Sequence, residues 1–459
     1  MARVNAEDKY RQMTETPIRD LILKLSVPTI ITNMISTIYN AADTYFIGRI
    51  STSASAAVGV CLTVQIVIQS IGFFFGQGTG TTMSKELGKH NVDRANQVAS
   101  TGFLSAFLLS FCVMIPGLLF KEPIARFLGS TETILPYALD YMHYILLAAP
   151  FMAGSIVLNQ QLRFQGFATS SMIGITAGGI LNMFMDPIFI FTMGMGIKGA
   201  ALSTMISQMV SFTILLVLHF RVSTARLSFK AVKISRDNYK PIYIGGLPSL
   251  CRQSVHSVAM IALNTAAKPF GDAAIAAMSI TNKVAGFTNS IVLGIGQAYQ
   301  PVCGFNYGAK KYDRVKEGFW FCVRILAVIL FCIALMEFCF PAQIIGFFRK
   351  GDPEVVRIGK LALRLRSITI TFSSWIMISN MLLQTTGKVY RASILGFARQ
   401  GIVLIPIASV LPPLIGMLGI QIAQPIADIV TLSMSIPMTL GVLRAMKEET
   451  NSPPSKSKV

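Results

Sequence analysis

Charged residues are scarce in this chain, and histidine and tryptophan are scarcer still. Only 13% of the 459 residues are charged, about half the share of a soluble domain, whereas 53% are hydrophobic and the mean hydropathy is +0.58. The apolar residues fall in runs of about twenty or more, the length that a helix needs to cross a bilayer core. This composition excludes an ordinary soluble enzyme and a disordered chain.

Metal, disulfide and catalytic motifs are also lacking. The four histidines are scattered, no CxxC occurs, and the seven cysteines lie in or beside apolar segments. Such cysteines are interpreted as small buried hydrophobes, not as a disulfide frame or a metal site. No nucleophile–base set or metal cluster is apparent, so we expect neither an enzyme nor a cofactor. The polar N-terminus shows no cleavable signal peptide, and the first apolar run must direct insertion itself.

Acidic residues are few relative to basic ones. There are 21 Asp and Glu against 40 Lys and Arg, which gives a net charge of +19. In a soluble protein this excess would suggest nucleic acid as a partner. Here most of the cations lie in short loops between apolar runs and no aromatic residues interleave with them, so the expected partner is the lipid bilayer and not nucleic acid.

Twelve apolar runs are long enough to be membrane-spanning helices. No short alternating segments typical of a β-barrel occur, so the predicted fold class is an all-α integral membrane protein. The predicted spans are 21–48, 58–82, 97–120, 137–161, 169–193, 199–220, 241–266, 275–300, 317–341, 359–384, 392–415 and 419–443.

The loop charges predict the orientation of these spans. An even number of spans places both termini on one side, which carries 26 Lys and Arg, Arg399 among them, against 9 on the other side, Arg349 and Lys350 among them. Cytoplasmic loops carry the excess of basic residues. We therefore expect a multi-pass protein of the cell (plasma or inner) membrane with both termini in the cytoplasm.

An internal repeat with an offset of 220 residues divides the chain. It pairs GQGTG at Gly76 with GQAYQ at Gly296, and it also pairs Pro28 with Pro248 and Gly196 with Gly416. Each copy holds six spans and so has the same orientation, which predicts two lobes related by a pseudo-two-fold axis along the membrane normal, as in transporters. The predicted parts are lobes at 1–220 and 241–443, a basic cytoplasmic linker at 221–240 and a polar cytoplasmic tail at 444–459.

Acids inside the first lobe are the first candidate functional groups, because ionisable residues deep in a bilayer are costly. Tyr39 and Asp43 are four residues apart in span 1, as are Asn182 and Asp186 in span 5, so each pair shares a helix face. Pro187 follows directly and predicts a kink with a free carbonyl oxygen. These oxygens suit Na⁺, and a desolvated carboxylate equally suits a proton. The alternative is that each acid is only hydrogen-bonded inside the bundle.

Several segments together resemble the MATE (multidrug and toxic compound extrusion) family, of the compact prokaryotic type. They are ADTYFIGR in span 1, GQGTG…GKHNVDRA after span 2, NMFMDPIFIF in span 5, GIKGAALSTMISQ in span 6 and GQAYQPVCGFNYGAKKYDR after span 8. The resemblance covers nearly the whole chain. It implies efflux of amphipathic, often cationic compounds driven by inward Na⁺ or H⁺. It also implies a cation-coupling site at Tyr39, Asp43, Asn159, Asn182, Asp186 and Thr204, with Na⁺ at Asp43, Asn182, Asp186 and Thr204.

The second lobe departs from one pattern of the family. Some members have an acid in span 7, where this chain has Arg252 and His256 instead. In the repeat, Gln208 corresponds to Asp428 of span 12, so we expect Arg252 and Asp428 to form a structural ion pair. A substrate contact and a proton relay are the alternatives for these residues.

The function predicted on this basis is a secondary active antiporter for small amphipathic drugs or toxins, working as a monomer. Twenty-three methionines and thirty phenylalanines suit an adaptable cavity. A flippase for a lipid-linked saccharide, which shares this two-lobe fold, is the alternative, because the deep cations Arg252, Lys283, Arg324, Arg364 and Arg366 could face a pyrophosphate. The span-1 and span-5 acids argue against it.

Overall fold

The computed structural model describes residues 5–348 and 352–451, and within them the chain is helical with no strand. The predicted all-α fold class is confirmed. Arg3, Arg349, Lys350, Lys456 and Lys458, which were counted among the loop cations, lie outside the described residues.

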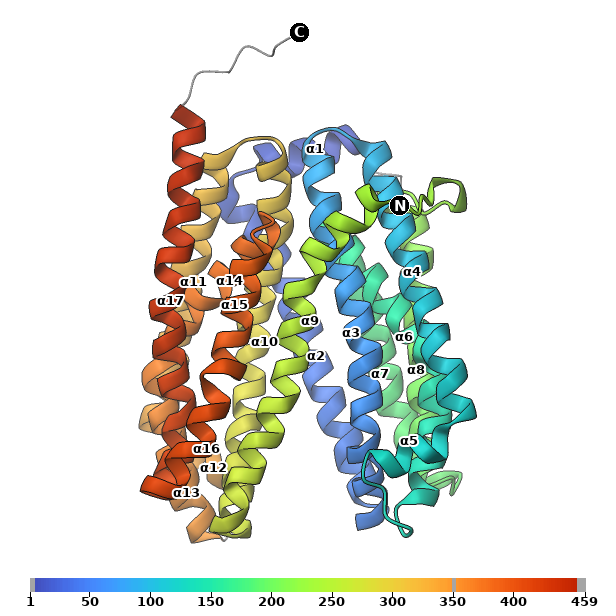
Figure 1. Cartoon of the computed structure of the whole chain (residues 1–459), viewed down its shortest axis with the longest axis vertical. Coiled ribbons are helices and arrows are strands. Elements are labelled where there is room, and N and C mark those ends of the chain that lie inside the picture. The colour runs from blue at the N-terminus through green and yellow to red at the C-terminus, as the bar shows by residue number, and fades with distance from the viewer. Residues whose placement is uncertain (1–4, 349–351, 452–459) are drawn as a thin grey trace. The chain divides into compact units, whose positions relative to one another are not determined.

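Each predicted span corresponds to one helix or to a chain of consecutive helices (Figure 1). In the first half these are α2 (Ile18–Gly48), α3 (Thr52–Gly88), α4 (Val92–Leu119), α6 (Leu135–Phe164), α7 (Ala168–Pro187) with the π-helix η1 (Ile188–Thr192), and α8 (Ile197–Val222). In the second half they are α9 (Arg236–Ala267), α10 (Asp272–Gly308), α11 (Tyr312–Cys339), α13 (Pro353–Thr369) with α14 (Phe372–Thr385), α15 (Val389–Phe397) with the π-helix η4 (Ala398–Ile402) and α16 (Leu404–Ile415), and α17 (Met417–Asn451). Shorter helices are α1 (Ala6–Glu15), α5 (Lys121–Phe127), α12 (Pro341–Phe348) and the 3₁₀ turns η2 (Phe229–Ala231) and η3 (Lys268–Phe270).

Length and hydropathy support membrane crossing for most of these segments. Among the described residues nine helices qualify individually, and α13 with α14 forms a tenth span bent by 56°. The remaining two spans are α9 and α10, which are 32 and 37 residues long and therefore long enough to cross. Several helices extend beyond the predicted spans: α3 covers Thr52–Gly88 instead of 58–82, and α10 continues to Gly308 instead of 300. In addition, α9 already begins at Arg236, and α17 continues to Asn451.

The count of loop cations included Arg399, although the predicted span 392–415 already contains it. Arg399 lies in η4, inside the span that runs from Val389 to Ile415, and not in a cytoplasmic loop. Moving it lowers the count on the side of the termini from 26 to 25 and leaves the asymmetry intact.

Contacts group the chain into two compact units. The first unit comprises residues up to Met13 together with Val27–Leu250, and the second comprises Thr14–Ser26 together with the residues from Cys251 onward. The boundaries therefore fall inside α1, α2 and α9, three helices that each contribute to both units.

The repeat found in the sequence has a counterpart in the backbone. Non-glycine residues rarely adopt positive φ, yet His90 (φ 59°) and its repeat partner Lys310 (φ 58°) both do so. Gly196 and Gly416 likewise have φ of 57° and 65° just before α8 and α17. Equivalent positions in the two halves therefore make equivalent turns, as expected when similar sequences fold alike.

Small residues allow α3 and α6 to pack closely in the first unit. Gly72, Gly76 and Gly80 recur every fourth residue and form one face of α3. A Cβ atom at these positions would lie within 2.9 Å of atoms of Ile156, Gln160 and Phe164 of α6. Such stripes of small residues are a common device for helix packing in membranes.

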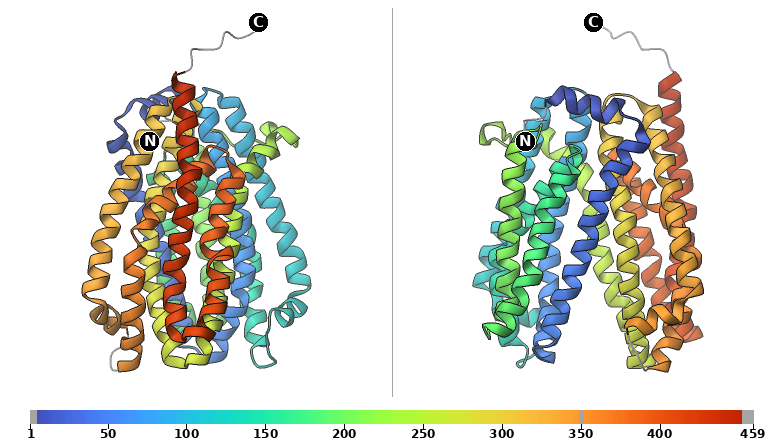
Figure 2. Two further views of the ribbon diagram at one scale, coloured as in Figure 1. Left: turned by 60° about the vertical axis from the view of Figure 1, so that its left-hand side comes forward. Right: turned by 180° about the vertical axis from the view of Figure 1, so that it is seen from behind.

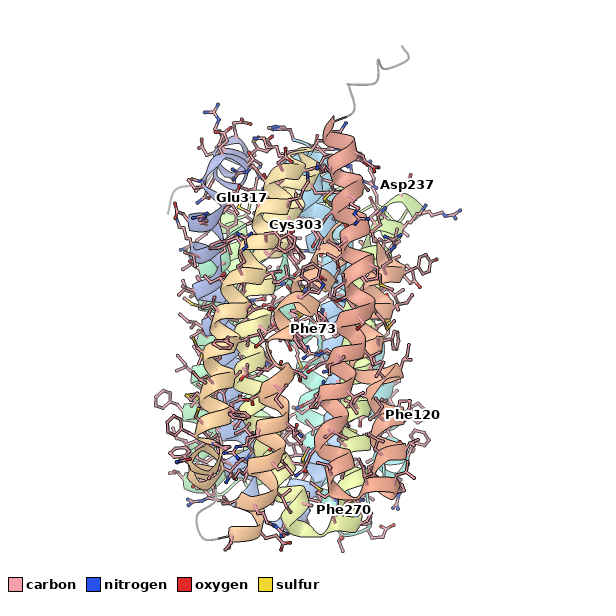
Figure 3. All side chains as sticks on the ribbon, turned by 90° about the vertical axis from the view of Figure 1, so that its left-hand side faces the viewer. Phe73, Phe120, Asp237, Phe270, Cys303 and Glu317 are labelled. Atoms are coloured by element: carbon pink, nitrogen blue, oxygen red, sulfur yellow. The ribbon has the colours of Figure 1, made fainter. Side chains whose placement is uncertain are left out.

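Large apolar side chains cover the outer surface. Phe120, at the end of α4, projects away from the ribbon in Figure 3 and is 59% exposed. Val328, Phe331 and Leu335 are exposed in the same way on α11. In water these patches would favour aggregation, whereas a lipid environment accommodates them.

We expect Gly78→Ala to destabilise the protein, whereas Gly59→Ala does not. A Cβ at Gly78 would lie 2.2 Å from the backbone oxygen of Ile242, which cannot rotate away, so we expect a loss of about 1–3 kcal/mol. Gly59 lies on the same helix with nothing within 4 Å, so alanine there should be neutral or stabilising by about 0.5–1 kcal/mol. Thermal unfolding in detergent measures both, and equal melting temperatures would contradict the prediction.

Candidate functional site

A polar cluster in the first unit is centred on Asn182 of α7. Its Nδ2 donates to Oδ1 of Asp186 (3.2 Å), to the hydroxyl of Ser203 (3.0 Å) and to that of Thr204 (3.5 Å). Ser203 in turn donates to the backbone oxygen of Asn182 at 3.3 Å. Ser203 and Thr204 are on α8, which lies beside α7 (Figure 2). The cluster therefore links two neighbouring helices through one buried amide.

Asp186 is fully buried at the end of α7. The next residue, Pro187, has no N–H, and the π-helix η1 follows it. The hydrogen-bond pattern of the helix therefore changes at Pro187, whereas the kink and the free carbonyl oxygen expected there stay predictions. Within the described residues, Oδ2 of Asp186 is buried and has no hydrogen-bond partner. One carboxylate oxygen thus remains open to an incoming cation or proton.

Asp43 and Tyr39 approach this cluster from α2. A Cβ at Gly179 of α7 would lie 3.1 Å from Cδ1 of Tyr39, which shows how closely α2 and α7 pack here. Oδ1 of Asp43 is also buried without a hydrogen-bond partner in the described part of the chain. The carboxylates of Asp43 and Asp186 are near enough to interact electrostatically.

Tyr141 of α6 belongs to the same cluster but was not predicted. It is buried, its hydroxyl accepts a hydrogen bond from Gln65 of α3 at 3.2 Å, and it interacts electrostatically with both Asp43 and Asp186. Ser203 was missed as well, and its hydroxyl interacts with Asp186. In the sequence, only the spacing of polar residues within spans 4 and 6 could have indicated Tyr141 and Ser203. That signal is not specific, because many polar residues in the spans have the same spacing.

Asn159 contacts a different part of α7. Its Nδ2 donates to the backbone oxygen and hydroxyl of Ser171, at 3.2 and 2.6 Å. Ser171 precedes Asn182 by eleven residues, or about 16 Å along the helix. The structure thus brings five of the six predicted site residues together: Tyr39, Asp43, Asn182, Asp186 and Thr204. The sixth, Asn159, instead connects α6 to the first turn of α7 by hydrogen bonds.

In the second unit, the predicted ion pair between Arg252 and Asp428 is wrong. Arg252 Nη1 donates instead to Oδ1 of Asn380 at 3.2 Å. Asp428 pairs with Arg399, whose Nε lies 2.8 Å from Oδ1, and Arg399 Nη2 also donates to Ser373 at 2.7 Å.

The error has two sources. The repeat aligns residues along the sequence and does not show which residue of a neighbouring helix faces Asp428. Arg399 had also been counted among the loop cations, although it falls inside the predicted span 392–415, and was not considered as a partner. The side chain of His256 lies outside the described part of the structure, so its predicted role stays a prediction.

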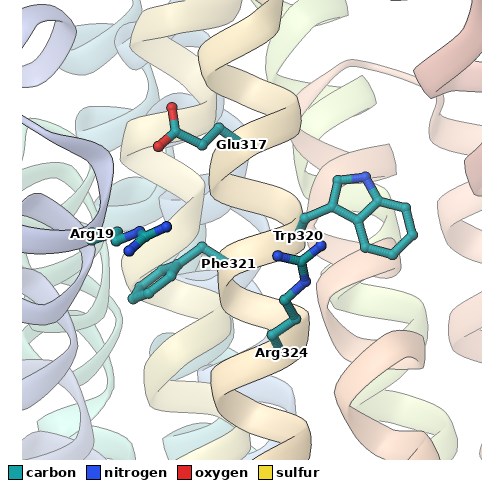
Figure 4. Close-up of a pocket in the computed structure, with 5 residues that line it drawn as sticks. All are labelled: Arg19, Glu317, Trp320, Phe321 and Arg324. Carbon is teal, nitrogen blue, oxygen red and sulfur yellow. The ribbon is translucent and has the colours of Figure 1, made fainter.

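The second unit also holds two pockets among its described residues. One, of about 170 Å³, is lined by residues of α9, α10, α13, α14, η4, α16 and α17, among them Arg399 and Asp428. The other, of about 510 Å³, lies at the start of α2 and on α11 (Figure 4). It is lined by Arg19, Glu317, Trp320, Phe321 and Arg324. Exposed arginine beside tryptophan is the pattern of residues at a membrane–water interface.

These features define a class of protein before any comparison. Twelve spans in two similar halves, with buried carboxylates inside both of them, are typical of a multi-span membrane transporter. The MatE family model matches residues 28–188 and 248–410, two segments that begin 248 − 28 = 220 residues apart. The chain belongs to this family, the MATE transporters, and is therefore a membrane protein of a transporter family.

Individual relatives agree with this assignment. The multidrug export protein MepA of Staphylococcus aureus is 26% identical over 424 residues, which are 92% of this chain and 93% of that protein. MepA of Staphylococcus haemolyticus is 28% identical over 419 residues, 91% and 92% of the two chains.

Solved structures share the fold. The outward-facing conformation of a multidrug resistance MATE family transporter of the MOP superfamily matches with a TM-score of 0.91 and 23% identity, over 98% of this chain and 100% of that chain. A MOP superfamily transporter from Pyrococcus furiosus, described as having a binding pocket of reverse polarity, matches with a TM-score of 0.88 and 23% identity, over 95% and 98%. At this identity they establish the fold alone, including its twelve helices in two lobes.

Proposed function

We propose that the protein is a secondary active antiporter that exports amphipathic, often cationic drugs or toxins in exchange for inward Na⁺ or H⁺. The observation that carries the proposal is the pair of interacting carboxylates, Asp43 and Asp186, each with a buried oxygen that lacks a partner in the described part of the chain. The multidrug export function in the name of the MepA relatives supports the same substrate class.

The chemistry of the cluster explains how an ion could drive export. Two carboxylates in a water-poor site repel each other unless a cation or proton lies between them. The amide oxygen of Asn182 and the hydroxyl of Thr204 are neutral ligands suited to Na⁺. Arrival of the ion from outside would compete with a cationic drug, or change how α2 packs on α7, and so release the drug outward.

The best direct test measures dye export in inverted vesicles under separate gradients. Ethidium accumulation driven by a Na⁺ gradient alone, or by a pH gradient alone, would identify the coupling ion. The proposal predicts that one of these gradients suffices, and export that needs neither gradient would contradict it.

A flippase for a lipid-linked saccharide is the second candidate, because Arg366 and Arg399 line a cavity in the second unit. Such a substrate carries a pyrophosphate that several cations could bind. The buried acids of the first unit have no role in that reaction. Rescue of a flippase-depleted bacterium favours this candidate, whereas raised tolerance of a drug-sensitive strain to ethidium favours export.

We also propose the arrangement of the chain in the membrane. The lobes are assigned to 1–220 and 241–443, and both termini, segment 221–240 and the tail 444–459 to the cytoplasm of a monomeric plasma-membrane protein. The basic residues of these loops support it.

A cysteine at position 228 should be inaccessible from outside intact cells. Ser228 is exposed in the segment between α8 and α9, and Thr133 is exposed in the loop between α5 and α6. Three spans separate these two positions, so the proposal assigns them to opposite sides of the membrane. In a background without the native cysteines, Thr133→Cys should react with an impermeant maleimide and Ser228→Cys only after lysis. The reverse pattern would overturn the proposed topology.

A further inference from the structure

A groove between the start of α2 and α11 combines cations with aromatic rings. Its volume is about 510 Å³, within the range of about 300–1,000 Å³ that is usual for ligand sites. Glu317, Trp320, Phe321 and Arg324 lie at positions i, i+3, i+4 and i+7 and therefore share one face of α11. Arg19 adds a second cation from α2, and in Figure 4 its side chain reaches toward Phe321. In the same view the guanidinium of Arg324 lies beside Trp320.

Packing and hydrogen bonds within the second unit hold the two walls of the groove together. A Cβ at Gly318 of α11 would lie 3.5 Å from Cδ1 of Ile22 and 3.6 Å from Cγ2 of Ile18, so the two helices are in contact here. Nη2 of Arg314 donates to the backbone oxygen of Thr16, just before α2, at 2.5 Å. The two arginines of the groove are therefore presented by helices that are packed against each other.

These two arginines have no partner within the residues described. Both Arg19 and Arg324 are exposed, and neither forms a hydrogen bond or an ion pair there. Glu317, the acid of the lining, interacts electrostatically with Arg314, which lies outside the lining. Its charge is therefore offset from outside the groove. The groove thus carries two guanidinium groups whose charges and donors are available to an anion.

The groove continues into a stripe of apolar side chains. Val328, Phe331 and Leu335 follow Arg324 at spacings of four, three and four residues on the same face of α11, and each is more than half exposed. Such a surface faces acyl chains in a bilayer, so Arg324 lies one turn from the acyl region, at the level of the lipid headgroups. Cationic groups followed by an apolar stripe match the order of a phospholipid, in which the phosphate is followed by acyl chains.

We infer that this groove binds the headgroup of an anionic phospholipid, with Arg19 and Arg324 on the phosphate and an acyl chain along the apolar stripe of α11. Two guanidinium groups favour a lipid with a net negative charge over phosphatidylcholine, whose choline cation they would repel. In the proposed topology this end of α11 lies in the cytoplasmic leaflet, where anionic lipids are concentrated. The lipid site goes beyond the proposed export function and does not depend on it.

Native mass spectrometry of the purified protein tests the site directly. The probes are phosphatidylglycerol and phosphatidylcholine with the same acyl chains. The wild-type protein should retain phosphatidylglycerol about tenfold or more tightly than phosphatidylcholine, and Arg19→Gln/Arg324→Gln should lose this preference, because charge-assisted hydrogen bonds to the phosphate are removed. Equal retention of the two lipids by the wild-type protein, or an unchanged preference in the double variant, would overturn the inference.

Lys24→Gln/Lys316→Gln is the matched control. It removes the same number of positive charges from the same two helices, but neither lysine lines the groove, and Lys316 pairs with Asp313 at 2.9 Å. This variant should keep the wild-type lipid preference. A loss as large as that in Arg19→Gln/Arg324→Gln would show attraction by the overall charge alone and would refute a specific site.

Thermal unfolding gives a second readout and distinguishes a lipid from a free anion. Since Arg19 and Arg324 have no partner in the described chain, the double variant should melt like the wild type in phosphatidylcholine. Phosphatidylglycerol should raise the melting temperature of the wild-type protein only. Inorganic phosphate in detergent should not raise it, and a rise that the double variant abolishes would assign the groove to a free anion instead. Neither measurement uses transport, so failure of the proposed export function would leave both results unaffected.

Discussion

The Asp43→Asn/Asp186→Asn variant should lose gradient-driven dye export completely while inserting into the membrane normally. Asparagine has nearly the volume of aspartate but can neither ionise nor take up a proton. The two carboxylates interact, and each has a buried oxygen without a partner within the described residues, so no other acid of the cluster replaces them. Export of ethidium under the driving gradient, normalised to protein in the membrane, measures the effect, and each single variant should also fall to background.

Asp140→Asn is the matched control for this experiment. Asp140 is an acid of α6 in the same unit, but it is partly exposed and pairs with Lys198 at 3.4 Å. Such exposed pairs contribute about 0–1 kcal/mol, so export should remain at the wild-type rate.

Thr204→Ala should retain partial export with weaker ion affinity, since its hydroxyl is one neutral ligand among several. Wild-type rates in the double aspartate variant would refute coupling through the first unit.

Breaking the Arg399–Asp428 pair should be the most destabilising single change among the charged residues of the second unit. Arg399→Gln leaves the carboxylate of Asp428, whose side chain is 3% exposed, without its counter-ion. Uncompensated buried charges cost about 3–5 kcal/mol. Arg399→Gln/Asp428→Asn removes both charges and should therefore cost less than the sum of the two single variants. Thermal unfolding of the purified protein in detergent measures all three.

A double-mutant cycle between Arg252 and Asp428 tests the ion pair that was expected from the repeat, for comparison with the observed pair of Arg399 and Asp428. Arg252 donates to Asn380, so Arg252→Gln and Asp428→Asn should be additive to within about 0.5 kcal/mol. Coupling between Arg252 and Asp428, or additivity between Arg399 and Asp428, would contradict the pairing seen here.

Sequence alone determined the helices and the repeat, because both depend on local or periodic signals. Runs of about twenty apolar residues need a helix in a bilayer whatever their neighbours are. Tyr39 and Asp43 are four residues apart, as are Asn182 and Asp186, and this spacing puts each pair on one helix face. The change of helix type after Asp186 also coincides with a local signal, since Pro187 lacks the N–H that an α-helix needs.

Only the tertiary structure decided which polar groups meet. Tyr141 and Ser203 join the first-unit cluster, and Arg399 replaces Arg252 at Asp428, because the rotation and packing of neighbouring helices set these contacts. Arg399 lies in a π-helix, where the extra residue per turn changes which side chains face inward, and periodicity of 3.6 residues cannot predict that.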